Sequence, residues 1–144
     1  MGEFHVAVGD RWSFAKTVSE SDVYLFAGIT GDLAPNHVDA AYMARSGYGR
    51  RIAHGALIIG FMSTTSTLAT AASRADESET AVSLGYDRIR FLAPVFFGDT
   101  LTVDYRIASI DRERRRATAD IEVRNQDGTL VAVATHVLKW VRNE

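Results

Sequence analysis

Apolar and polar side chains alternate along the second half of the chain, as they do in strands. Over residues 101–108 every second side chain is large and apolar, the period of two that a half-buried strand shows. Similar stretches cover 82–97, which Pro94 interrupts, and 117–123, where the alternation is less regular. The last stretch, 130–141, is apolar on both faces, which is typical of a central strand. The pattern predicts an antiparallel meander.

The first half begins with a short strand, predicted at 12–18, and continues as helices. Ser19 and Asp22 are typical of a helix cap, because their side-chain oxygens can accept from N–H groups of the first turn. Gly28 and Gly31 are predicted to end the helix that starts there.

Residues 32–37 are predicted to be irregular, because Pro35 lacks a backbone N–H and disfavours helix at the residue before it. A short helix is predicted at 39–45. The longest helix is predicted at 55–72, and its apolar start marks a helix buried on most sides. The charged segment 74–80 is predicted to be an exposed loop. A meander that wraps one long helix is an α+β fold with segregated elements.

Composition narrows the classes of function. A chain of 144 residues fits a single domain, 1–144. The formal net charge of −2 removes the general electrostatic case for binding nucleic acid or an anionic membrane. The absence of cysteine excludes disulfides, thiolate nucleophiles and cysteine-ligated metal. This absence also makes a cytoplasmic location the expectation, and the start of the chain shows no recognisable secretory signal.

One stretch, 52–73, has no Lys, Arg, Asp or Glu and is long enough to be tested as a membrane span. It is interrupted by His54, by two glycines and by a run of serines and threonines. We therefore expect a buried helix and no membrane partner.

The predicted irregular loop carries the side chains best suited to chemistry. Asp32 and His37 flank Pro35, just after a helix that Gly31 ends. A carboxylate and an imidazole held by a stiff loop can share one water, take a proton from it and return a proton elsewhere. Spacing alone is weak evidence for this, and by itself it favours a capping aspartate and a histidine in a surface pocket.

Three segments resemble the MaoC-like, (R)-specific enoyl-CoA hydratase family. Phe26–Asp39 (FAGITGDLAPNHVD) resembles its hydratase motif, Arg51–Leu57 (RIAHGAL) the entry into its central helix, and Arg90–Leu101 (RFLAPVFFGDTL) the strand and turn that follow. The resemblance implies a hot-dog fold, an antiparallel sheet wrapped around one long central helix. It also implies a homodimer or a dimer of dimers.

The resemblance assigns roles to four residues. The catalytic pair falls on Asp32 and His37, and we favour Asp32 as the base and His37 as the proton donor. Gly55 would offer its backbone N–H to the thioester carbonyl, where enolate charge develops. Ser63 falls where the family has a supporting hydroxyl. The implied reaction is hydration of a trans-2-enoyl-CoA or the reverse dehydration. No metal or organic cofactor is expected, since coenzyme A is part of the substrate.

One departure and one absence bear on this interpretation. The family usually has asparagine before the proline, where this chain has Ala34, and Asn36 follows the proline instead. Residues 40–75 contain no Asp or Glu, so the central helix lacks the carboxylate common in hot-dog thioesterases. An acyl-CoA thioesterase and a non-catalytic acyl-thioester-binding subunit stay open as alternatives.

The remaining histidines are expected to be structural. A packing role is favoured for His54, although it could orient the loop, and His136 is predicted to pack on the last strand. No histidine–carboxylate spacing predicts a metal site. The basic run Arg112–Arg116 is expected to be a solvated turn. Three arginines closer to the pair in sequence are favoured as contacts for the phosphates of coenzyme A: Arg45, Arg50 and Arg51.

Overall fold

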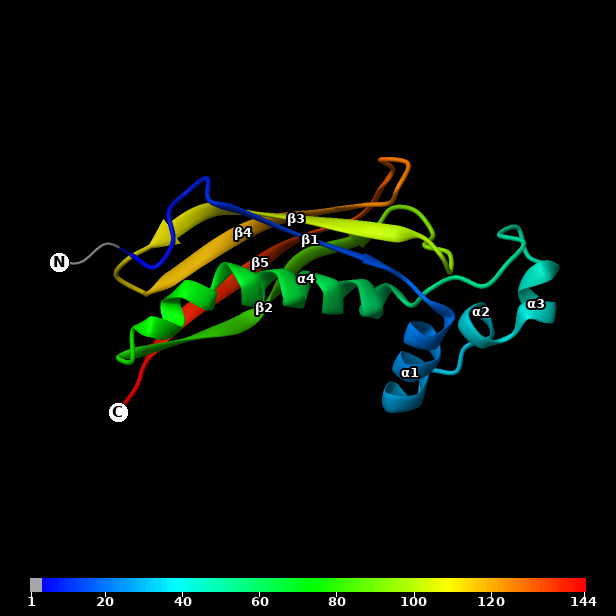
Figure 1. Cartoon of the computed structure of the whole chain (residues 1–144), viewed down its shortest axis with the longest axis horizontal. Helices are drawn as coiled ribbons and strands as arrows, with labels where there is room; N and C mark the ends of the chain where they lie inside the picture. Colours follow the sequence, from blue (N-terminus) through cyan, green and yellow to red (C-terminus); the bar gives the residue numbers. More distant parts are fainter. Residues whose placement is uncertain (1–3) are drawn as a thin grey trace.

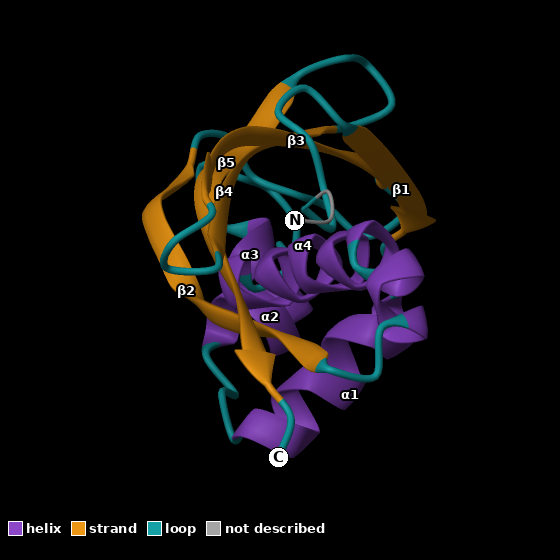
Figure 2. Cartoon of the chain, turned by 90° about the vertical axis from the view of Figure 1, so that its left-hand side faces the viewer, coloured by secondary structure: helices purple, strands orange, loops and turns teal. Residues whose placement is uncertain are grey.

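Residues 4–144, the part that the computed structural model of the chain describes, form one five-stranded antiparallel sheet in the order β1-β3-β4-β5-β2. Its strands are β1 (Arg11–Thr17), β2 (Glu79–Phe91), β3 (Thr100–Asp111), β4 (Arg116–Arg124) and β5 (Leu130–Arg142). The sheet arches over one long helix, α4 (Gly55–Ala69), as Figure 2 shows along the helix axis. The predicted α+β hot-dog fold is confirmed.

The alternation that predicts β3 fixes which of its side chains face α4. Leu101, Val103, Tyr105 and Ile107 are fully buried, whereas Thr102 between them is exposed. Complete burial of one such side chain contributes about 1.5–3 kcal/mol. The helix presents its own buried face to the sheet, and the residues of that face are Ile58, Phe61, Met62, Thr65, Ser66 and Ala69.

Helix α1 (Glu20–Thr30) begins as predicted. Ser19 is its N-cap and forms a reciprocal capping box with Asp22. The helix ends at Gly31, whose φ of 80° is the left-handed conformation that glycine adopts without a steric penalty. Gly28 lies inside α1, so the prediction that it helps to end the helix is wrong.

The predicted irregular stretch contains a one-turn helix, α2 (Pro35–Val38). Pro35 occupies its first position, where a missing N–H is harmless and the fixed φ favours a helix start. The next predicted helix is confirmed as α3 (Ala40–Ala44), capped by Asp39. These short helices and α1 lie together at the end of the molecule where α4 begins (Figure 1).

Three predicted boundaries are wrong. Helix α4 stops at Ala69, and a 3₁₀ helix, η1 (Ala71–Ala75), follows. Hydroxyls at this end bond backbone carbonyls, including Thr70 to the carbonyl of Ser66 at 3.0 Å, and such bonds compete with regular helix. Strand β2 starts within the predicted charged loop and ends before Pro94. Within residues 4–144, no helix is both long and apolar enough to cross a membrane.

Candidate active site

The end of α1 and the single turn of α2 bring Asp32 and His37 together. A carboxylate oxygen of Asp32 and one ring nitrogen each from His37 and His54 lie within 4.8 Å of one another. Asp32 is exposed, whereas His37 is only 9% exposed. The loop therefore places a solvated carboxylate next to a buried imidazole, an arrangement suited to gripping one water molecule.

Hydrogen bonds hold His37 against the segment that leads into α4. His37 Nδ1 lies 2.8 Å from the carbonyl oxygen of Ile52. A carbonyl only accepts, so Nδ1 carries a hydrogen and Nε2, on the opposite edge of the ring, is the nitrogen left for chemistry. The backbone N–H of Ile52 donates to the carbonyl of Asn36 at 2.9 Å, which pairs the two segments.

His37 and Gly55 line the same cavity, which has a volume of about 360 Å³. Gly55 is the first residue of α4, so its backbone N–H has no acceptor within the helix. The other residues that line the cavity are Asn36, Tyr48, Ile52, Ala53, Ile58, Phe91, Leu92, Ala93, Pro94 and Val95. Most are apolar, as in a pocket for a small organic substrate.

The Phe91 ring packs directly against Gly55. A Cβ atom at position 55 would lie 2.6 Å from a ring carbon of Phe91, far inside van der Waals contact. Glycine is therefore required at this position unless the Phe91 ring moves, and it keeps the start of α4 open to the cavity.

Ser63 lies apart from this group. It is two turns further along α4 than Gly55, about 12 Å along the helix axis. Its side chain is exposed and does not line the cavity. The supporting role assigned to it by resemblance stays a prediction.

Sequence reasoning underrated His54, which contacts both members of the pair. Its Nε2 lies 3.0 Å from the carbonyl oxygen of Asp32, and its ring stacks on that of His37 with centroids 3.7 Å apart. One indication of this role was present in the sequence: His54 directly precedes the glycine that begins the buried helix. The packing role favoured from the sequence is thus incomplete.

Arg51 is engaged within the chain. Its guanidinium bonds the Tyr24 hydroxyl, pairs with Glu20 at 3.3 Å and lies 4.8 Å from the ring centroid of Phe97. The guanidinium of Arg51, expected from the sequence to contact substrate phosphates, is thus already engaged by groups of this chain. Arg50 lies over the ring of Phe96 at 3.9 Å.

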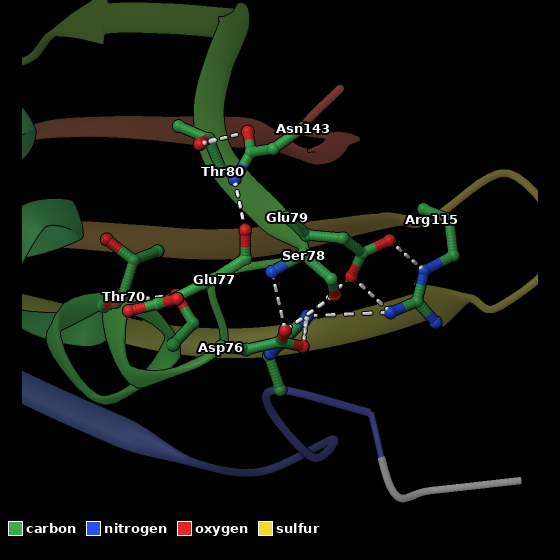
Figure 3. A network of polar contacts seen from close by, with 10 residues as sticks. Thr70, Asp76, Glu77, Ser78, Glu79, Thr80, Arg115 and Asn143 are labelled. Carbon is green, nitrogen blue, oxygen red and sulfur yellow. Dashed lines mark hydrogen bonds and ion pairs between the residues drawn. The ribbon is translucent and has the colours of Figure 1, made fainter.

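A second polar cluster is formed by His5, Asp76, Glu79 and Arg115, where β2 begins. Figure 3 shows its Asp76, Glu79 and Arg115. Arg115 donates to both carboxylate oxygens of Glu79, at 2.9 and 2.6 Å. His5 Nε2 lies 2.7 Å from Glu79 Oε2. Arg115 first, and His5 second, lower the pKa of Glu79 to about 2.

Each of the two clusters contains a histidine that the sequence analysis did not connect with it: His54 in the first and His5 in the second. His5, Asp76 and Glu79 offer atoms within 4.8 Å of one another, a spacing compatible with a metal ion. A cation there would face the guanidinium of Arg115, so the residues fit an ion-pair clasp better than a metal centre.

His136 is buried on β5, as predicted. It lies between the hydroxyls of Ser83 and Tyr105, each at 2.7 Å, and stacks on Tyr86. Burial lowers the pKa of His136 to about 4.

Comparison with known proteins decides the family. The model of the MaoC like domain matches residues 5–129. The chain belongs to the MaoC-like family. It is 38% identical over 110 residues to the (R)-specific enoyl-CoA hydratase of Rhodospirillum rubrum, covering 76% of this chain and 72% of that protein. It is also 38% identical over 103 residues to the 3-hydroxybutyryl-CoA dehydratase of Methylorubrum extorquens, covering 71% of this chain and 60% of that protein.

A solved structure agrees with this membership. The (R)-hydratase from A. caviae superposes with a TM-score of 0.83 at 25% identity, over 93% of this chain and 96% of that one. This MaoC-like protein is therefore an enzyme of the hydratase and dehydratase class. The sequence prediction of an enzyme of this class is confirmed.

Proposed function

We propose that this MaoC-like enzyme catalyses the (R)-specific hydration of trans-2-enoyl-CoA to 3-hydroxyacyl-CoA, or the reverse dehydration. The observation that carries the proposal is the approach of Asp32 and His37 beside the cavity that contains Gly55. The names of the related hydratase and dehydratase support the substrate class.

Asp32 and His37 each carry out one of the two proton transfers of the reaction. Water bonds to C3 through its oxygen while Asp32 takes one of its protons. C2 receives a proton from Nε2 of a protonated His37. Transfer of the proton from Asp32 to His37 then restores both groups, so the net change is addition of one water. Because both groups act from one loop, both transfers take place on one face of the double bond.

The backbone N–H of Gly55 stabilises the negative charge that develops during this addition. As C3 is attacked, negative charge moves to the thioester oxygen as an enolate. A backbone N–H at the start of a 15-residue helix suits that oxygen, because the helix dipole is positive there. Loss of one such donor typically lowers the rate about 10²–10³-fold.

The test is loss of the absorbance of the conjugated double bond in crotonyl-CoA and longer enoyl-CoAs. We expect turnover by the wild-type chain and at least a 100-fold loss in Asp32→Asn and His37→Ala. Asp39→Asn is the matched control, because asparagine also caps helix α3 and Asp39 does not line the cavity. No turnover with any chain length, or release of free thiol in place of hydration, would refute the proposal.

We also propose that the enzyme works as a homodimer or a dimer of dimers. The edge strand β2 exposes Val82 and Leu84, and the outer positions of β5 beside it, including Val133 and Val137, are only half-buried. A long edge strand with exposed apolar side chains is a surface on which a second copy can pair. Sedimentation at micromolar concentration should give a dimer or larger, and a monomer would contradict this.

A further inference from the structure

We infer that His54 is a positioning residue for the reaction. It holds Asp32 and His37 at fixed positions relative to the backbone N–H of Gly55. The inference rests on the proposed function. His54 is 2% exposed and precedes Gly55 directly, so one residue connects the loop with the start of α4.

The first contact fixes the backbone of Asp32. The carbonyl oxygen of Asp32 can only accept, so His54 Nε2 carries the hydrogen of the 3.0 Å bond. Asp32 is otherwise exposed and follows a glycine in the left-handed conformation. The bond from His54 ties this exposed loop to a buried side chain. By holding the backbone of Asp32, it fixes the position from which the Asp32 side chain extends.

The second contact fixes the ring of His37. The two imidazoles stack with centroids 3.7 Å apart and planes 23° apart, while Phe26 lies 4.7 Å from the His54 ring. The bond from His37 Nδ1 to Ile52 holds one edge of that ring, and the stack holds its plane. Together they aim Nε2 of His37.

Packing alone does not account for a histidine here. His54 Nδ1 is buried and has no hydrogen-bond partner among residues 4–144. An apolar ring would fill the same space without burying an unpaired nitrogen, which is unfavourable. What the histidine adds is the Nε2–H that reaches Asp32.

Two variants separate the contacts. His54→Phe keeps a ring for the stack and removes the donor to Asp32. His54→Gln places an amide N–H near the Nε2 position and removes the ring. We expect kcat to fall about 10- to 100-fold in His54→Phe with KM changed less than about 2-fold. His54→Gln should recover part of that loss.

The matched control is His136→Phe, another buried and stacked histidine outside the cavity. It is expected to melt at a lower temperature but to keep its kcat per folded molecule. Retention of more than half of the wild-type kcat by folded His54→Phe would overturn the inference. So would an equal loss of kcat in His54→Phe and His54→Gln.

A second readout separates failure of the inference from failure of the proposed function. Hydrogen exchange of the Leu33 and Ala34 amides should quicken at least 10-fold in His54→Phe and less in His54→Gln. If no enoyl-CoA is turned over by the wild-type chain, the proposed function fails while this measurement still decides the positioning role. Unchanged exchange in His54→Phe would overturn that role.

Discussion

Glu79→Gln tests the ion-pair clasp that joins the N-terminal segment to β2. The Glu79 side chain is 8% exposed and bonds both Arg115 and His5, and an Asp76 carboxylate oxygen lies 3.9 Å from His5 Nε2. Glutamine keeps the shape of the side chain and removes its charge. The variant should unfold more easily at neutral pH, because Arg115 loses its charged partner.

The magnitude follows from the lowered pKa. A fall from 4.5 to about 2 corresponds to about 3 kcal/mol of stability, at 1.36 kcal/mol for each pKa unit. A carboxylate with a lowered pKa contributes fully above its unfolded value of 4.5, and the contribution is lost as the pH falls toward 2. In a domain of this size, removal of the Glu79 charge by the substitution should lower the melting temperature by about 6–12 °C at pH 7.

The assay is thermal unfolding of both proteins at one concentration, at pH 7, 5, 4 and 3. The difference in melting temperature should be largest at pH 7 and shrink by more than half at pH 3. Glu113→Gln, an exposed acid of the neighbouring hairpin, should change the melting temperature little at any pH. A Glu79→Gln protein that melts within 1 °C of wild type at pH 7, or a difference that does not depend on pH, would refute the reasoning.

Three further changes address the helix start, the buried network and the first cap. Gly55→Ala should lower kcat at least 10-fold at nearly unchanged melting temperature, because the half-exposed Phe91 ring, which lines the cavity, must shift; normal kinetics would contradict this. Tyr105→Phe should destabilise the fold by about 1–3 kcal/mol in urea unfolding, since it leaves His136 Nδ1 unpaired inside the core. Ser19→Ala should cost about 1 kcal/mol in the same measurement through loss of the α1 cap, and Ser19→Asn should restore it.

Local physical rules account for the elements that the sequence predicted well. The alternation at 101–108 gives β3 because strand side chains point to opposite faces, and only one face meets α4. Ser19 and Asp22 cap α1 because both partners lie within one turn. The Asp32–His37 pair was expected from the family resemblance and not from spacing, because six extended residues can span about 20 Å. The end of α1 and the single turn of α2 bring the two side chains together.

What the sequence could not predict depends on contacts between distant residues. His54 meets Asp32 across 22 positions, and His5 meets Glu79 across 74, so neither contact leaves a local pattern. The one-turn helix at Pro35 was missed because proline indicates both a break and a helix start. Which of the two a proline does depends on the segment that the following turn packs against.

The hydrogen bonds around the cavity make the loop and the start of α4 one unit. The loop reaches the 52–54 segment through His37 Nδ1, the Asn36 carbonyl and the Asp32 carbonyl, and that segment continues directly into Gly55. The backbone N–H of Ala53 in turn donates to the carbonyl of Val95 at 2.8 Å, and both residues line the cavity. The Asp32–His37 pair and Gly55, to which we propose the proton transfers and the N–H donor role, therefore cannot shift independently. Since an error of about 1 Å in such a geometry lowers rates about 100-fold, substitutions within 52–54 should act on kcat even where no substrate contact is lost.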